Sequence, residues 1–196
     1  MNRAEGLVFC VWRCLLDFSE RFSQALQATL GMEMHGQLGE PGLVRFSPST
    51  VTFGTEELEY RDGVYSFYQY ERASRGGASF KSSSLHVMEH CLTLHFGKRF
   101  RIWSDYKLLT LDECSVPRVG WSLVPVGDGR QPGYLGIRSE SGVFYSCKTY
   151  GSWLLSCLSF VVEFSPLDVL ECYLHPDAGP LLSQWVDREW IPEEDE

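Results

Sequence analysis

The strongest constraint on the fold of this chain is a hairpin signal at residues 58–72. The run LEYRDGVYSFYQYER places Asp62-Gly63 between two stretches rich in Tyr, Val and Phe. Asp-Gly is a preferred pair for a tight two-residue turn, because both turn positions need positive φ. The run therefore predicts two antiparallel strands joined at Asp62-Gly63.

The second of these strands carries aromatic side chains on both faces. Alternation points Tyr65 and Phe67 to one face, whereas the other face receives Val64, Ser66, Tyr68 and Tyr70. One face is thus predicted to join the core and the other to form a contact surface, since Tyr, Trp and Arg anchor interfaces. The alternative is core aromatics beside a merely solvated turn. The candidate partner-binding residues are Tyr65, Tyr68, Tyr70, Arg72 and Arg75.

Apolar residues at steps of three and four predict the helices. Gly31 and Gly97 follow two of these patterns as natural stops. Ser165 followed by Pro166 has the form of a helix start, and His175-Pro176 ends that helix. The predicted helices span residues 7–30, 82–97, 153–161 and 166–174.

Short β-type runs separated by turn residues predict the remaining strands, which form an antiparallel meander in the second half of the chain. Together these elements predict an α+β fold, in which an antiparallel β-sheet of hairpins and a meander packs with three to four α-helices. We expect residues 1–190 to form a single domain and residues 191–196 an acidic disordered tail. The further predicted strands are 43–46, 51–53, 100–103, 121–126, 134–138 and 143–147.

Composition narrows the partners. The 196 residues include 17 Lys+Arg and 26 Asp+Glu, a formal net charge of −9, so no basic excess is present to bind nucleic acid. The apolar run at 7–16 is shorter than the about 20 residues needed to span a bilayer. The seven scattered cysteines contain no C-x-x-C and favour a reducing compartment. These features predict a cytoplasmic protein that binds neither nucleic acid nor membrane.

One string matches a catalytic motif. His86-Val87-Met88-Glu89-His90 is H-x-x-E-H, in which the two histidines could hold Zn²⁺ while Glu89 acts as a base. Only Glu163 or Glu171 is a plausible third ligand. The apolar stripe of this helix places both histidines toward the polar side, so we interpret the string as a solvated helix face. We predict no enzyme, metal or cofactor, with a zinc-dependent hydrolase as the alternative.

Three blocks in order carry a family resemblance. They are YQYERASRGG at 68–77, the helix SLHVMEH…LHFG at 84–97 followed by Phe100-Arg101, and SPLDVLECYLHPDAGPLL at 165–182. Residues 17–183 resemble the immunity proteins of bacterial polymorphic toxin systems, the family that includes the immunity factor for tuberculosis necrotizing toxin.

The resemblance implies a cytosolic, non-enzymatic antitoxin. Such a protein binds the catalytic domain of a cognate secreted toxin and blocks its active site, and an NAD glycohydrolase is one candidate for that toxin. The net charge of −9 suits a basic toxin surface. The remaining alternative is a protein-interaction module that has no toxin partner.

Overall fold

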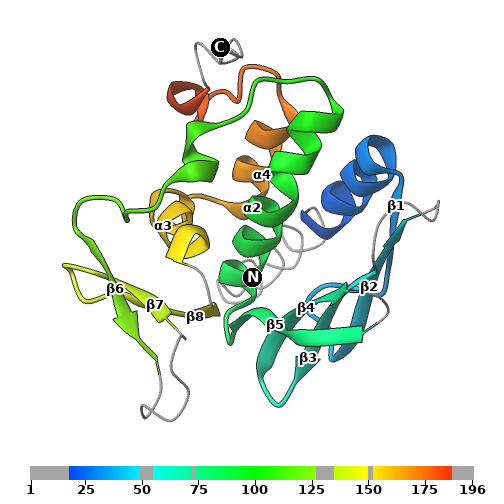
Figure 1. The fold of residues 1–196 in the computed structure, drawn as a ribbon, viewed down its shortest axis with the longest axis horizontal. Helices are drawn as coiled ribbons and strands as arrows, with labels where there is room; N and C mark the ends of the chain where they lie inside the picture. The colour runs from blue at the N-terminus through cyan, green and yellow to red at the C-terminus, as the bar shows by residue number, and fades with distance from the viewer. Residues whose placement is uncertain (1–17, 49–54, 72–73, 127–134, 150–151, 187–196) are drawn as a thin grey trace, which may run out of the picture.

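The predicted fold class is confirmed. The computed structural model describes residues 18–48, 55–71, 74–126, 135–149 and 152–186, and within them helices pack on one face of an antiparallel sheet (Figure 1). The core lies between these two layers, and the opposite face of the sheet carries no described helix.

The sheet has eight described strands in the order β1-β2-β3-β4-β5-β8-β7-β6, and every neighbouring pair is antiparallel. The hairpin at Asp62-Gly63 and the meander β6-β7-β8 are both present, as predicted. Pairing of β5 with β8 over Phe80–Ser82 joins the two halves of the sheet. The strands are β1 (Met32–His35), β2 (Gly42–Pro48), β3 (Glu56–Arg61), β4 (Val64–Glu71), β5 (Ser74–Ser82), β6 (Trp121–Pro125), β7 (Leu135–Ser139) and β8 (Phe144–Thr149).

Four helical segments cover the inner face. Residues 18–25 are helical and continue into a π-helical turn, Leu26–Leu30, which ends at Gly31 with φ 60° as predicted. The others are α2 (Leu85–Trp103), α3 (Ser152–Val161) and α4 (Pro166–Leu174), with short 3₁₀ helices at Thr110–Glu113 and Ser183–Trp185. In the described ranges no single helix is long and apolar enough to span a membrane. Taken together, α3 and α4 reach the required length and apolar composition, but the pair is bent by 104°.

Several predictions fall on residues outside the described ranges. The structure does not describe residues 7–17 of the predicted first helix, the predicted strand at 51–53, Arg72 or the predicted tail at 191–196. These remain predictions, as does the division into a single domain and a tail.

Buried phenylalanines join the sheet to the helices. The ring of Phe22, from the first helical segment, lies 5.5 Å from Phe96 of α2 and 6.2 Å from Phe46 of β2, in edge-on contacts. On the neighbouring strands, the rings of Phe67 and Phe80 stack at 4.6 Å. Edge-on and offset contacts of this kind stabilise a core beyond the area they bury.

Two predictions about α2 are wrong. Gly97 does not end the helix, and the predicted strand at 100–103 is its last turn, so α2 continues to Trp103. The role of Gly97 is spatial: a Cβ atom there would lie 2.4 Å from ring atoms of Tyr173 on α4. Glycine is therefore needed for the close approach of two helices, and helix packing overrides its tendency to end a helix.

The sequence also missed two strands. Neither β1 nor β5 is among the predicted strands: β1 follows directly after the helix stop at Gly31, and the first half of β5 is the polar, glycine-containing run SRGG. Both strands form by pairing with a neighbour. β1 pairs with β2, and β5 pairs with the hairpin strand β4 in a ladder that contains two register shifts. Strand formation depends on such partners more than on intrinsic propensity.

Arg101 connects the end of α2 to the end of α4. Its side chain is fully buried, and its Nη1 and Nη2 donate to the carbonyl oxygens of His175 at 2.8 Å and Pro176 at 2.7 Å. Its Nε donates to the carbonyl of Lys107 at 2.5 Å. Longer contacts reach the carbonyls of Cys172 and Tyr173, so one guanidinium satisfies carbonyl groups that the α4 helix end leaves free.

We expect Arg101→Met to lower the free energy of unfolding by about 3 kcal/mol or more, because buried carbonyls would lose their donors. Urea unfolding measures this as a lower midpoint at an unchanged slope. Lys98→Met on the same helix is the control, since that ammonium is half-exposed and lies 3.8 Å from one carboxylate; it should cost less than about 0.5 kcal/mol. Equal midpoints for the two variants would contradict this role of Arg101.

Candidate partner-binding surface

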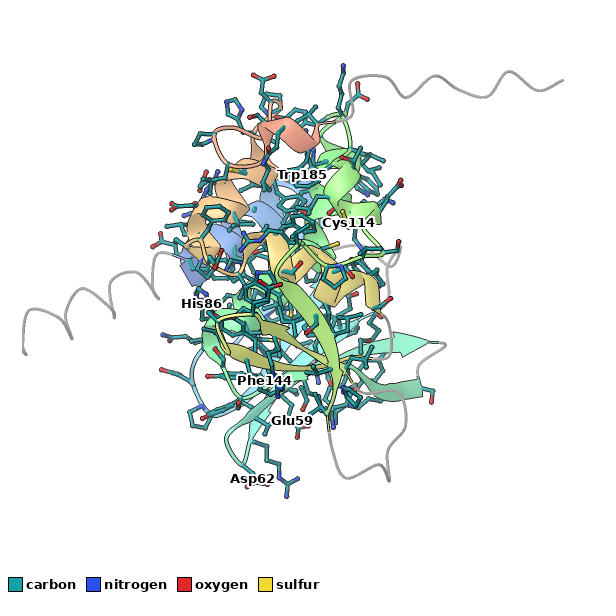
Figure 2. The ribbon with its side chains drawn as sticks, turned by 90° about the vertical axis from the view of Figure 1, so that its left-hand side faces the viewer. Glu59, Asp62, His86, Cys114, Phe144 and Trp185 are labelled. Atoms are coloured by element: carbon teal, nitrogen blue, oxygen red, sulfur yellow. The ribbon has the colours of Figure 1, made fainter. Side chains whose placement is uncertain are left out.

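A polar cluster lies on the face of the sheet opposite the helices. We call it the Glu57 cluster. Strand register assembles it, because Arg45 of β2 and Tyr68 of β4 both pair with Glu57 of β3, while Tyr70 pairs with Arg75 of β5. Figure 2 shows Glu59 in the sheet layer, on the side away from the helices. The members are Arg45, Glu57, Glu59, Tyr68, Tyr70 and Arg75.

Glu57 is the centre of this cluster, and its side chain is only 5% exposed although it lies on the outer face. Arg45 donates to Oε1 through Nε at 3.1 Å and Nη2 at 3.0 Å. The Tyr70 hydroxyl donates to Oε2 at 2.7 Å, and this bond raises the pKa of Tyr70 above its usual value. The carboxylate is therefore paired at both oxygens, which holds Tyr70 protonated and fixed in place.

Arg75 and Tyr68 form the second part of the cluster. The guanidinium of Arg75 lies 3.6 Å from the centre of the Tyr68 ring, and its Nη2 donates to Glu59 at 2.9 Å. Stacking and the ion pair together hold both flat side chains in one orientation. The two parts join where Nε of Arg75 lies 3.8 Å from Glu57.

The structure sorts the five predicted contact residues. Tyr68, Tyr70 and Arg75 lie together in the Glu57 cluster, whereas Arg72 is outside the described residues. The choice of Tyr65 needs correction: it points inward, is 5% exposed and stacks on Tyr60 at 4.2 Å. Alternation had placed Tyr65 with Phe67, and the core occupies that face.

The sequence analysis missed three charged residues of the Glu57 cluster. Arg45, Glu57 and Glu59 were not selected, although Glu57 and Glu59 alternate on β3 in the run that precedes the Asp62-Gly63 turn. In a hairpin this spacing puts both carboxylates on the face of Tyr68. That alternation was the available signal.

Four of the five residues of the H-x-x-E-H string, Val87–His90, are buried and His86 is half-buried, so the interpretation of the string as a solvated face is wrong. Glu89 and His90 are buried, and His86 lies between the helix layer and the sheet (Figure 2) with its Nε2 2.9 Å from the carbonyl oxygen of Val162. Burial raises the pKa of Glu89 to about 8. Burial, and then the adjacent His86, lower the pKa of His90 to about 3. Both groups are therefore neutral at pH 7.

The string also lacks the geometry of a zinc site. The backbone of Phe164 faces the His90 ring, yet neither ring nitrogen makes a well-oriented hydrogen bond. Both candidate third ligands are engaged elsewhere: Glu163 pairs with Arg118 at 2.5 Å, and Glu171 with Arg21 at 2.6 Å. Within the described ranges, no three His, Cys, Asp or Glu residues come together in a way that could hold a metal ion.

Comparison with known proteins supports the interpretation as a binding protein. A model of the family immunity protein 61 matches residues 51–181, which is more than half of the chain. The chain belongs to the immunity protein 61 family. This confirms the resemblance to immunity proteins drawn from the three sequence blocks, and the family implies a non-catalytic inhibitor with a toxin as its partner.

A solved structure shows that this immunity protein shares its fold with another chain. Rv3902c from M. tuberculosis matches with a TM-score of 0.65 and 20% sequence identity, over 86% of this chain and 95% of that chain. At that identity the similarity concerns the fold. No curated protein matches the sequence at a significant level.

The immunity protein contains a second charged cluster, on the inner side of β3. Glu56 accepts hydrogen bonds from Gln69 at 3.2 Å and from Arg99 at 2.9 and 3.1 Å, and lies 2.9 Å from Nε2 of His95. Burial alone would raise the pKa of Glu56, but His95 and Arg99 lower it to about 2. The described side-chain partners of this buried carboxylate come from β4 and α2, so the cluster attaches the helix to the sheet.

A depression of about 600 Å³ lies between the first helical segment and β1. It is open to solvent, and its polar lining consists mainly of serine and glutamine with Glu33 and His35. Glu33 and His35 lie 3.4 Å apart and are both exposed. The lining residues are Ser23, Gln24, Gln27, Ala28, Glu33, Met34 and His35.

The buried carboxyl of Glu89 predicts a pH dependence of stability. Its pKa is about 8 in the folded chain against an ordinary value of 4.5, so the folded chain keeps a proton that the unfolded chain has released. The free energy of unfolding should therefore fall by about 1 to 2 kcal/mol as pH rises from 6.5 to 8. Urea unfolding at the two pH values measures the change.

Glu89→Gln should remove this dependence, because the amide does not titrate. Glu113→Gln is the matched control, since the Glu113 side chain is exposed, and it should keep the dependence of the unsubstituted protein. The assignment is wrong if Glu89→Gln loses as much stability as the unsubstituted protein over this pH range.

Proposed function

We propose that this protein is an antitoxin that binds the catalytic domain of a cognate secreted toxin and blocks its active site. The observation that carries the proposal is the family match over residues 51–181. An inhibitor of this kind needs a complementary surface and no reactive groups, which fits a chain in which Glu89 and His90 of the H-x-x-E-H string are buried.

The Glu57 cluster is the contact surface that we propose. Tyrosine and arginine dominate the energetics of protein interfaces, and this cluster presents two of each. The stacking of Arg75 on Tyr68 and the bond from Tyr70 to Glu57 fix these side chains before any partner binds. Binding then costs little side-chain entropy, which favours high affinity.

The charge of the chain suggests the character of the partner. The net charge is −9, while the Glu57 cluster itself balances two arginines against two glutamates. The acidic excess therefore lies elsewhere in the chain and not within the anchor residues. A net negative charge attracts a basic surface and speeds the first encounter.

The toxin that we propose first is an NAD glycohydrolase, on the strength of the resemblance to the immunity factor for tuberculosis necrotizing toxin. An enzyme that binds NAD must hold its pyrophosphate, and proteins hold pyrophosphate with basic side chains and backbone N–H groups. A basic cleft of this type is complementary to an acidic inhibitor.

Co-expression tests the proposal most directly. The catalytic domain encoded by the neighbouring reading frame is expressed in bacteria with and without this chain. We expect growth arrest without it, rescue with it and co-purification of the two chains. An NAD-hydrolysing toxin would deplete cellular NAD only in the absence of this chain. Persistent growth arrest, or the failure of the chains to co-purify, would overturn the proposal.

A matched pair of variants tests the Glu57 cluster. We expect Arg75→Ala to weaken the equilibrium affinity for the toxin domain by about 30-fold, because the substitution removes one anchor residue and the guanidinium that stacks on the Tyr68 ring. Arg61→Ala removes an exposed arginine that neighbours the cluster on β3 and pairs only loosely with Asp62, at 3.5 Å. That variant should bind within about threefold of the unsubstituted protein. If both variants bind equally well, the contact surface lies elsewhere.

Stopped-flow association tests the electrostatic part of the proposal. The association rate should fall steeply as ionic strength rises, because salt screens the attraction between the acidic inhibitor and a basic toxin. The dissociation rate should change little. An association rate that is indifferent to salt would remove the charge argument and leave the binding proposal intact.

A further inference from the structure

A tight turn precedes β6, in the loop that leads from the 3₁₀ helix Thr110–Glu113 (Figure 1). The amide of Trp121 donates to the carbonyl of Arg118 at 3.0 Å, which closes a four-residue turn. Gly120 has φ +85° at the third position, where a type II turn requires positive φ. Val119 therefore occupies the projecting second position of the 118–121 turn.

The 118–121 turn is fixed to the fold on both sides. The amide of Arg118 donates to Ser159 Oγ of α3 at 2.8 Å, and that hydroxyl donates to the carbonyl of Ser156 at 2.6 Å. On the other side, the amide of Glu140 donates to the carbonyl of Gly120 at 2.7 Å. The backbone of the turn is thus held by α3 and by Glu140, the residue that follows β7.

The Arg118 side chain is also held in place. Its guanidinium forms an ion pair with Glu163 at 2.5 Å and lies 5.8 Å from the centre of the Trp121 ring. These contacts hold the Arg118 side chain against Glu163 and Trp121. The side chains of the neighbouring valines make no such contacts.

Two valines beside Arg118 are instead left in solvent. Val119 is 96% exposed and Val116 is 71% exposed. A single exposed apolar side chain is ordinary. Here two β-branched residues lie on either side of Arg118, whose backbone and side chain are both held by other residues. The two valines are therefore exposed on a well-held backbone, and neither belongs to the described core.

We propose that Val116 and Val119 insert into an apolar pocket of the toxin's catalytic domain, as a contact separate from the Glu57 cluster. This inference rests on the proposed function. Because the turn is already rigid, insertion costs little entropy of ordering. The ion pair with Glu163 neutralises Arg118, and the Glu140 carboxylate lies 3.9 Å from the Cβ position of Gly120. A basic side chain at the rim of the pocket would therefore face Glu140.

Val119→Asp tests the insertion. A carboxylate cannot enter an apolar pocket without losing its hydration, so we expect the affinity for the neighbouring reading frame's catalytic domain to fall by about 100-fold or more. Thermal unfolding should be unchanged, because the side chain is exposed in the free protein. Val143→Asp is the control: Val143 is 46% exposed and lies in the connection between β7 and β8. That variant should bind within about threefold of the unsubstituted protein.

Ser159→Ala tests the bracing of the turn without changing the valines. Loss of the bond to the Arg118 amide should loosen the turn and weaken binding by about tenfold, mainly through slower association. A merely structural role of Ser159 would lower thermal stability and leave the affinity of the folded fraction intact. That outcome would overturn the bracing argument.

These measurements separate the two proposals. If the unsubstituted chain does not bind the toxin domain, the proposed function fails and this inference falls with it. If the unsubstituted chain binds and Val119→Asp binds within about threefold of it, the inference is wrong while the proposed function stands. Loss of binding in both Val119→Asp and Val143→Asp would point to a general effect of added negative charge and would also overturn the inference.

Discussion

The arrangement of the helices depends on one buried guanidinium. Arg101 lies in the last turn of α2 and donates to the carbonyls of His175 and Pro176 at the end of α4, which links two elements about 70 residues apart in sequence. Beside it, Gly97 lets the Tyr173 ring pack directly on the α2 backbone, and the Tyr173 hydroxyl donates to Asp112. The buried charge of Arg101 is tolerated because each of its three guanidinium nitrogens donates to a backbone carbonyl oxygen.

The described helices all lie on one face of the sheet. No described helix covers the opposite face, and there the contacts within the Glu57 cluster keep its side chains ordered. Elsewhere in the fold, Ser159 of α3 accepts a hydrogen bond from the Arg118 amide and so holds the 118–121 turn. In the proposed binding mode the helix layer contributes indirectly, because it leaves the face with the Glu57 cluster without a described helix and holds the 118–121 turn in place.

The H-x-x-E-H string shows how a local pattern can mislead. Its spacing satisfies a metalloenzyme motif, and its helical periodicity suggests a solvated face, yet the structure buries Glu89 and His90. Both interpretations treated the helix as having one apolar side. A helix enclosed by a sheet, by α3 and by α4 is buried almost all round, and a long apolar stripe cannot reveal that from sequence.

The sequence by itself determined features that depend on neighbouring residues. Asp62-Gly63 specified the hairpin, Ser165-Pro166 specified the start of α4, and alternation placed Tyr65 with Phe67 opposite Tyr68. Tertiary structure decided which face became core, why Gly97 lies inside a helix, and which charges gather around Glu57. Turn and cap preferences act through local backbone geometry, whereas burial and cross-strand pairing depend on segments that meet only after folding.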